Sequence, residues 1–194
     1  MSVVTLVSGG LDSTVMALLV RGEGVTQAPL FIDYGQRNLR REWAACTSTF
    51  RRLGLPRPTR MDVAGFGRTV KSGLTSKKLD VLKDAFLPAR NLLFLVCGAA
   101  FAKDVGANAV LIGLLSESTH LFPDQTSRFI DQATGAIHQA LGERIAVVAP
   151  LRPFVKSDIV KLAGKHGVTG TYSCHKGMLR PCGKCIACRE YVGT

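Results

Sequence analysis

The sequence predicts an α/β fold in which helices cover both faces of a five-stranded parallel sheet. Short continuous apolar runs alternate with longer segments whose apolar residues recur at three- and four-residue spacing, the pattern of buried parallel strands and amphipathic helices. A second feature is a C-terminal segment that holds four of the six cysteines. We therefore expect an α/β domain over residues 1–168 and a small metal-binding segment, packed on it, over residues 169–194.

The composition narrows the class of protein. A chain of 194 residues suits one hydrophobic core. The longest apolar run, around residues 92–102, is too short to cross a bilayer, and no basic signal-peptide region precedes Val3, so we expect a cytoplasmic protein without a membrane span. The net charge of +11 suits a nucleic acid or a polyphosphate ligand.

The first apolar run, Val3–Val7, leads into the glycine turn Ser8-Gly9-Gly10-Leu11-Asp12-Ser13, from which a helical pattern runs to Gly22. Adjacent glycines let the backbone approach a ligand closely, and the hydroxyls of Ser8 and Ser13 join the free amides of the helix start. This arrangement predicts a phosphate-binding site. The turn has neither the Walker A lysine nor the G-x-G-x-x-G pattern, and an ordinary strand-to-helix turn is the alternative.

The second strand is predicted at residues 29–33 and ends in the polar turn Tyr34-Gly35-Gln36-Arg37. A helix over residues 39–53, which Gly54 ends, carries apolar residues on one face. Four arginines lie off that face and favour a solvated surface over an RNA-binding patch: Arg40, Arg41, Arg51 and Arg52.

The later elements repeat these two patterns. We predict strands at 59–63, 109–114 and 145–149, and helices at 89–105, at 127–141 and, last, through Ala163. Residues 64–88 are expected to form a long loop with at most a short helical turn. The helix at 89–105 is apolar nearly all round, so it should be buried. Ser157 is the expected cap of the last helix, and Gly167 follows its end.

Polar residues follow three of the predicted strands, at Ser8–Ser13, Tyr34–Arg37 and residues 115–120. Ligands of parallel sheets bind beyond the carboxyl ends of the strands, which lie at the same edge. We therefore expect these three segments to form one site.

The cysteine pattern Cys174-x7-Cys182-x2-Cys185-x2-Cys188 predicts a metal centre. Four thiolates at this spacing can close a tetrahedron around one Zn²⁺, which we favour, and an iron–sulfur cluster is the competing interpretation. A disulfide cluster is not expected in a cytosolic chain. Cys46 and Cys97 fall in helical patterns and are expected in the core.

The Ser8–Ser13 turn resembles the SGGxDS loop of the PP-loop ATP pyrophosphatases, which split ATP between its α and β phosphates. The whole chain resembles the QueC family of 7-cyano-7-deazaguanine synthases. Beyond the loop, the resemblance is carried by Phe31–Arg37, Pro88–Phe94, Phe122–Asp124, Ala149–Leu151 with Lys156, Thr171–Cys174 and Cys182–Cys188.

The resemblance implies an adenine nucleotide alpha hydrolase-like fold and a ligase. Such enzymes convert 7-carboxy-7-deazaguanine, ammonia and ATP into 7-cyano-7-deazaguanine, on the route to modified nucleic acids such as queuosine in tRNA. It also implies ATP and Mg²⁺, one structural Zn²⁺ per chain and a homodimer.

The site residues follow from the resemblance and the loop chemistry together. The nucleotide would be bound by Leu6, Val7, Ser8, Gly9, Gly10, Leu11, Asp12, Ser13 and Thr14. The substrate would be bound by Tyr34, Gln36, Arg37, Arg90, Asn91 and Asp124. Asp12, Ser13 and Lys156 would act in catalysis, and Cys174, Cys182, Cys185 and Cys188 would hold the metal. Each of three residues also has a structural interpretation: Asn91 as a helix cap, Asp124 as a turn residue and Lys156 as a solvated lysine.

The chain departs from the family pattern near the expected substrate. Ala89 stands where the family usually has glycine, Gln125 stands where it usually has cysteine, and the segment before Pro88 is short. Two alternatives to nitrile synthesis therefore remain open. One is an enzyme that joins the activated deazaguanine to a protein or other amine, as QueC-like members of antiviral systems do, and the other is a tRNA-modifying PP-loop enzyme.

Overall fold

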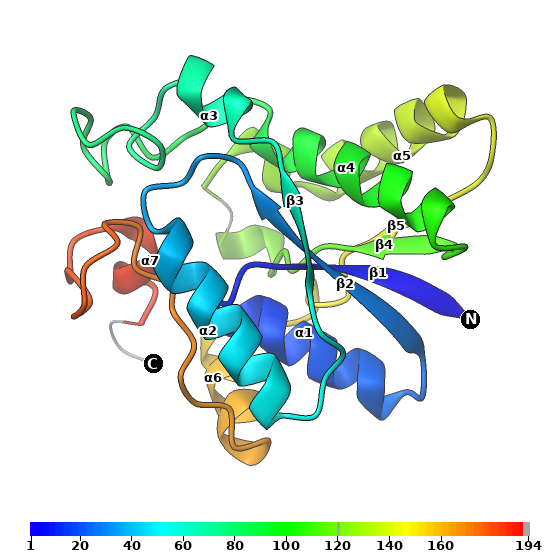
Figure 1. Cartoon of the computed structure of the whole chain (residues 1–194), viewed down its shortest axis with the longest axis horizontal. Coiled ribbons are helices and arrows are strands. Elements are labelled where there is room, and N and C mark those ends of the chain that lie inside the picture. The colour runs from blue at the N-terminus through cyan, green and yellow to red at the C-terminus, as the bar shows by residue number, and fades with distance from the viewer. Residues whose placement is uncertain (120, 192–194) are drawn as a thin grey trace.

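The computed structural model describes residues 1–119 and 121–191 and confirms the predicted parallel sheet (Figure 1). Every strand pair is parallel, in the spatial order β3-β2-β1-β4-β5. The strands are β1 (Ser2–Val7), β2 (Thr26–Asp33), β3 (Thr59–Asp62), β4 (Ala109–Leu111) and β5 (Ala146–Val148). β2 starts earlier and β4 ends earlier than their apolar runs, and His120 of the third polar segment lies outside the described residues.

The central strand β1 explains why the apolar runs are continuous. Val3 is paired with Gln27 of β2 on one side and with Ala109 of β4 on the other. Successive side chains point to opposite faces, and both faces are covered, so Val3 and Val4 are both buried. The strand order reverses between β1 and β4, which places the switch point of the sheet directly after β1.

Helices cover the two faces of the sheet unequally (Figure 1). One face packs on α1 (Leu11–Gly22), α2 (Leu39–Arg52) and α6 (Lys156–Lys165), and the other packs on α4 (Arg90–Asp104) and α5 (Ser127–Leu141). The short helix α3 (Gly65–Thr69) lies within the predicted loop, and α7 (Ile186–Arg189) belongs to the cysteine-rich segment. No helix in the described part of the chain is long and apolar enough to cross a membrane.

Two predictions about helices are wrong. The helix at 89–105 is not buried all round, because β1, β4 and α5 cover one side of α4 and leave Leu92 and Val96 37% and 49% exposed. Ser157 is not the cap of α6, because the helix starts earlier, after Val155. The Asp158 carboxylate accepts the Val155 N–H at 3.1 Å and does the capping that was expected of Ser157.

Candidate active site

The turn after β1 forms a loop whose shape depends on glycine. Gly9 has φ +79°, and a Cβ there would lie 2.4 Å from the carbonyl oxygen of Glu42 on α2. The loop therefore packs directly against α2, which only glycine permits. Gly10 is the N-cap of α1, so the free amides of this helix start face the switch point of the sheet.

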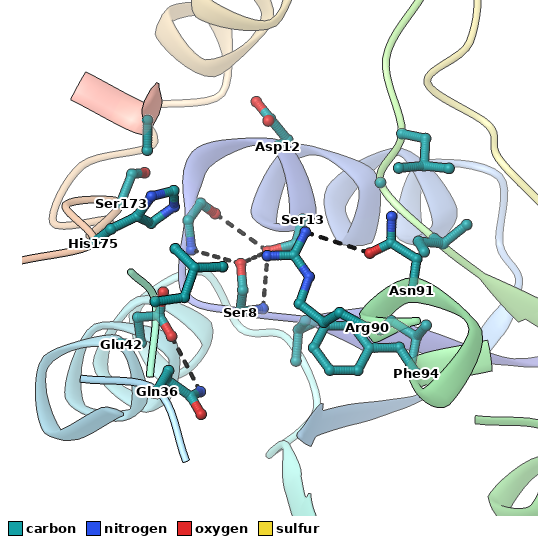
Figure 2. Close-up of a pocket in the computed structure, with 18 of the residues that line it drawn as sticks. Ser8, Asp12, Ser13, Gln36, Glu42, Arg90, Asn91, Phe94, Ser173 and His175 are labelled. Carbon is teal, nitrogen blue, oxygen red and sulfur yellow. Dashed lines mark hydrogen bonds between the residues drawn. The ribbon is translucent and has the colours of Figure 1, made fainter. Parts of the chain in front are cut away.

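Ser13 ties the loop together (Figure 2). Its hydroxyl accepts the backbone N–H of Ser8 at 3.1 Å, lies 3.2 Å from the Ser8 hydroxyl, and donates to the Gly10 carbonyl at 3.3 Å. Thr14 donates to the same carbonyl at 2.8 Å. These bonds hold the donors of the loop in place before a ligand arrives, which is the condition for stabilising charge that develops during a reaction.

A cavity of about 280 Å³ lies over this loop, beyond the carboxyl ends of the strands. An adjoining cavity of about 600 Å³ shares the Asp12 and Lys156 walls and extends over residues 113–116. The first two polar segments meet at the smaller cavity, whereas the third lines only the adjoining one, through Leu115, Ser116 and Thr119. The expected residues on the wall of the smaller cavity are Leu6, Val7, Ser8, Gly10, Leu11, Asp12, Ser13, Tyr34, Gln36, Arg90, Asn91 and Lys156.

Four of the expected site residues lie behind the wall of the smaller cavity. Gly9 and Thr14 support the loop from its back, as described above. Arg37 points to the long loop, where its guanidinium donates to the carbonyls of Gly73 and Ser76 at 3.1 and 3.3 Å. Asp124 holds Asn91, whose side-chain amide donates to the Asp124 carbonyl at 3.0 Å. Asn91 is therefore positioned by a tertiary contact and does not cap α4, which begins at Arg90.

Lys156 connects the loop to the C-terminal segment. Its ammonium group lies 2.7 and 2.8 Å from the two Asp12 carboxylate oxygens and 2.9 Å from a carboxylate oxygen of Glu190. It also lies 5.0 Å from the centre of the Tyr191 ring. Burial lowers the pKa of Lys156, but the charges of Asp12 and Glu190 outweigh burial and raise it above its usual value. The amine is therefore a fixed positive charge at the cavity.

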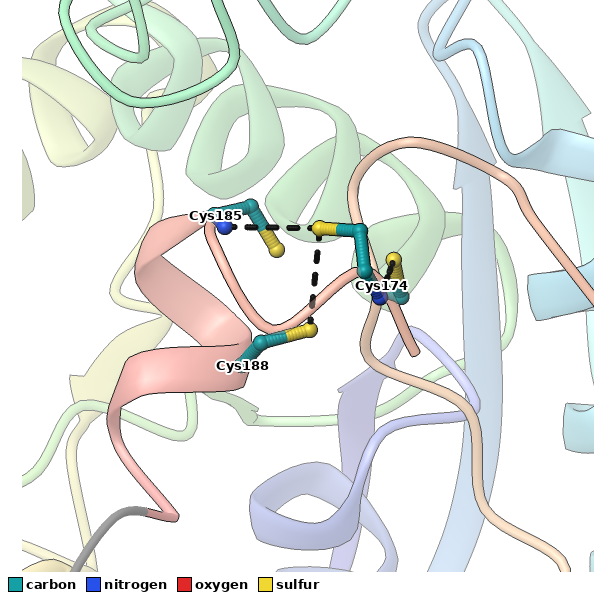
Figure 3. Close-up of side chains that lie close together, drawn as sticks. Cys174, Cys185 and Cys188 are labelled. Atoms are coloured by element: carbon teal, nitrogen blue, oxygen red, sulfur yellow. Dashed lines mark hydrogen bonds between the residues drawn. The ribbon is translucent and has the colours of Figure 1, made fainter. Parts of the chain in front are cut away.

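The four cysteines of the C-terminal segment converge as predicted (Figure 3). Their sulfur atoms all lie within 4.8 Å of one another. The backbone N–H groups of Cys182 and Cys185 donate to the sulfur atoms of Cys174 and Cys182, both at 3.4 Å. Cys46 is fully buried and Cys97 is half-buried against the core, in line with the core positions expected for them.

Electrostatics favour a cation among these sulfur atoms. Burial raises the pKa of Cys182, but the backbone N–H groups of Lys184 and Cys185 outweigh it and bring the pKa to about 6. Burial and the neighbouring Cys185 raise the pKa of Cys188 to about 12. Four close sulfur atoms are a donor set that metals bind, and a positive ion among them would compensate the charge of thiolates.

The cysteine-rich segment is a wall of the cavity and not a separate unit. Tyr172 donates its N–H to the Gly9 carbonyl at 2.9 Å, and the side chain of Asn38, the N-cap of α2, donates to the Cys174 carbonyl at 3.2 Å. Arg41 donates to the Gly177 carbonyl at 3.0 Å, and Arg52 donates to the Thr169 carbonyl. Two of the four arginines expected on a solvated face thus also anchor this segment, whereas Arg40 and Arg51 are exposed as predicted.

Comparison with known proteins identifies the family. The family model described as queuosine biosynthesis protein QueC matches residues 2–191. The chain belongs to the QueC family. A 7-cyano-7-deazaguanine synthase of Campylobacter curvus is 33% identical over 96% of this chain and 89% of that protein. The synthase of Methanothermobacter thermautotrophicus is 31% identical over 97% of this chain and 91% of that protein.

Solved structures place this QueC family member in the PP-loop fold. A predicted tRNA methyltransferase subunit of Methanocaldococcus jannaschii matches with a TM-score of 0.57 and 16% identity, over 84% of this chain and 74% of the other. A 4-thiouridine synthetase solved with RNA and bound ATP matches with a TM-score of 0.54 and 21% identity, over 86% and 41%. A U34-tRNA thiolase of Methanococcus maripaludis with a [4Fe-4S] cluster matches with a TM-score of 0.56 and 14% identity, over 92% and 62%. At these identities the likeness shows the fold alone.

The departures from the QueC pattern have visible consequences. Ala89 adopts a left-handed backbone with φ +59°, which explains why glycine suits this position. Gln125 lines the cavity, but its side-chain oxygen accepts the N–H groups of Leu121 and Phe122 at 2.8 and 2.9 Å. It therefore stabilises the turn at the cavity mouth and provides no nucleophile.

Sequence reasoning missed several residues of this wall. Glu42 lines the cavity from α2, and Tyr172, Ser173, His175 and Glu190 line it from the C-terminal segment. A signal for Glu42 was present, because it falls three residues after Leu39 and four before Cys46, on the apolar face of its helix. Tyr172 and Ser173 lie in the stretch Thr171–Cys174 that carries the family resemblance, whereas nothing local to His175 or Glu190 shows that their segment returns to the loop.

Proposed function

We propose that this protein is an ATP-dependent enzyme that makes 7-cyano-7-deazaguanine from 7-carboxy-7-deazaguanine and ammonia. One observation carries the proposal: a preorganised PP-loop opens onto a cavity in a chain that aligns nearly end to end with 7-cyano-7-deazaguanine synthases. Ser8 and Ser13 would hold the pyrophosphate of ATP, with help from the amides of the α1 start.

The chemistry requires activation at the α-phosphate. A carboxylate oxygen attacks this phosphorus, pyrophosphate leaves, and the product is a mixed anhydride with AMP. Ammonia then attacks the carbonyl carbon, AMP leaves, and loss of a proton gives the amide. In a second round the amide oxygen attacks the α-phosphate of another ATP, and loss of AMP and protons gives the nitrile.

The residues on the wall suit these steps. Negative charge develops on the leaving pyrophosphate, and Lys156 places a fixed positive charge beside the loop. Asp12 offers carboxylate oxygens next to the phosphate site, where Mg²⁺ would be held together with phosphate oxygens and would neutralise their charge. Tyr34, Gln36, Arg90 and Asn91 would contact the acyl substrate.

We also propose that the four-cysteine centre holds one structural zinc ion. Four sulfur donors saturate a tetrahedral ion and leave no open position, which suits a structural role. Free thiols at such a site require a reducing compartment, which supports a cytoplasmic location. A homodimer, implied by the family resemblance, is supported by the exposed Leu92 and Val96 on α4, which offer an apolar surface to a second copy.

Product analysis tests this proposal. Purified protein is incubated with 7-carboxy-7-deazaguanine, ammonium and Mg-ATP. The products are separated, and their masses are measured by mass spectrometry. The expected product is the nitrile, with two AMP formed for each nitrile. A product that stops at the amide, or deazaguanine attached to a protein or to tRNA, would contradict the proposal.

A further inference from the structure

Glu42 is a buried carboxylate on the wall of the cavity whose role the steps above do not use. It lies in the first turn of α2 and is only 9% exposed. One of its oxygens accepts the side-chain amide of Asn38 at 2.8 Å, and the other accepts that of Gln36 at 3.2 Å. Both oxygens are therefore held in a defined orientation toward the cavity (Figure 2).

This carboxylate is short of hydrogen-bond donors. An ionised carboxylate has about four acceptor sites, and the side chains of Gln36 and Asn38 fill two of them. Burial raises the pKa of Glu42 to about 7, although those two hydrogen bonds and the charge of Arg90 act in the opposite direction. A ligand that brought two N–H donors would satisfy the remaining acceptor sites and stabilise the charged form.

Donors lie elsewhere on the same wall. Figure 2 shows Arg90 on the other side of Ser8 from Glu42, and His175 lines the same cavity. Arg90 Nε and His175 Nδ1 are buried nitrogen atoms without a hydrogen-bond partner in the described part of the chain. The cavity thus presents an acceptor on the side of α2 and a positive donor on the side of α4, with the phosphate-binding loop beside both.

We propose that Glu42 binds the N1–H and 2-amino groups of the deazaguanine ring, with its 7-carboxylate directed toward Arg90 and the PP-loop. This inference rests on the proposed function and identifies how the site recognises its substrate. A guanine-like edge presents two adjacent N–H donors, which match the two oxygens of a carboxylate. Adenine presents a ring-nitrogen acceptor at the corresponding edge, which a carboxylate repels. Glu42 therefore also keeps the adenine of ATP out of the deazaguanine subsite.

A thermodynamic cycle that combines a change of residue with a change of ligand tests this assignment. The affinities of 7-carboxy-7-deazaguanine and its analogue without the 2-amino group are measured by calorimetry, without ATP, for the wild type, Glu42→Gln and Glu190→Gln. The wild type is expected to bind the analogue about 10- to 100-fold more weakly, because a hydrogen bond to a charged group is lost. Glu42→Gln is expected to bind the two ligands with affinities within about twofold of each other. Glu190→Gln, which changes another carboxylate of the cavity, is expected to keep the wild-type discrimination.

The outcomes separate this inference from the proposed function. If the wild type binds 7-carboxy-7-deazaguanine but Glu42→Gln keeps the full discrimination, or if the wild type does not discriminate, the subsite is overturned and the proposed function stands. If the wild type does not bind 7-carboxy-7-deazaguanine, both are overturned. Should Glu42→Gln fail to fold, nuclear magnetic resonance of the ¹⁵N-labelled ligand on the wild type decides. Downfield shifts of the N1 and amino protons on binding support the subsite, and unshifted protons overturn it.

Discussion

The PP-loop and the cysteine-rich segment, residues 169–191, face the same cavity but are held in place by different interactions. The loop follows β1, which is hydrogen-bonded to strands on both sides, and it is braced by Ser13 and by contact between Gly9 and α2. The segment has the four-residue helix α7 as its regular structure, and its small buried cluster includes Cys174 and Cys185. The comparison teaches that one wall of the cavity is fixed by the sheet, whereas the other is held by hydrogen bonds to the loop and to the region of α2 and contains four cysteines that could hold a metal.

The largest effect is expected from the loop itself. Ser13→Ala removes the acceptor of the Ser8 N–H and the hydroxyl that we propose donates to pyrophosphate. We expect kcat to fall about 100-fold or more, with the melting temperature nearly unchanged, as loss of one preorganised donor typically does. Steady-state release of AMP measures this. Ser48→Ala, on α2 outside the cavity, is the matched control, and a similar fall there would mean that the assay reports stability and not the loop.

The pH dependence of stability is expected to report on Glu42, the buried carboxylate of α2 that lines the cavity. Its pKa is about 7 in the folded protein and 4.5 at its ordinary value. Between these values the folded state keeps a proton that the unfolded state has lost, so the wild type loses stability as pH rises from 4.5 to 7. Glu42→Gln cannot ionise and escapes this loss, which amounts to about 3 kcal/mol.

Urea unfolding of the wild type and Glu42→Gln at several pH values between 4.5 and 8 tests this sign. The variant should gain stability relative to the wild type over this interval. His175, whose pKa burial lowers to about 4, titrates in both proteins and cancels in the difference. A difference that does not change with pH would show that Glu42 keeps an ordinary pKa.

Disruption of the four-cysteine centre is expected to affect the two walls of the cavity differently. Cys188→Ser removes one ligand of the centre, and we expect ATP to bind about tenfold more weakly while the far-ultraviolet circular dichroism keeps its α/β form, because the sheet does not depend on the segment. Calorimetric titration with Mg-ATP measures this, and Cys97→Ser, outside the centre, is the control. Unchanged ATP affinity would show that the segment is not part of the nucleotide site.

Metal analysis of the wild type should give about one zinc ion per chain. Substantial iron in place of zinc would exclude the zinc assignment.

The smallest effect is expected at Ala89. A left-handed backbone costs an alanine about 1 kcal/mol relative to glycine, so Ala89→Gly should stabilise the folded protein by about that amount. Ala140→Gly, on the exposed side of α5, should destabilise it by a similar amount, since glycine weakens a right-handed helix. Thermal unfolding compares the two variants, and equal shifts in the same direction would contradict the strain assigned to Ala89.

The local patterns predicted the sheet, the PP-loop and the metal centre, because apolar spacing and cysteine spacing are short-range properties of the chain. Ser157 was assigned the wrong role, because Asp158 caps an earlier helix start. Arg37 and Asp124 were expected at the substrate, but their partners at Gly73 and Asn91 are set by tertiary packing. The contact of Tyr172 with Gly9 joins residues at opposite ends of the chain, and no local pattern encodes it.

The most direct test of carboxylate activation at the PP-loop follows the carboxylate oxygens. The protein is given 7-carboxy-7-deazaguanine labelled with ¹⁸O in the carboxylate, together with ammonium and Mg-ATP, and the AMP is analysed by mass spectrometry. Each adenylation transfers one substrate oxygen to the α-phosphate, so each AMP should carry one ¹⁸O. Label in inorganic phosphate or pyrophosphate, or AMP without label, would contradict attack of the carboxylate on the α-phosphate.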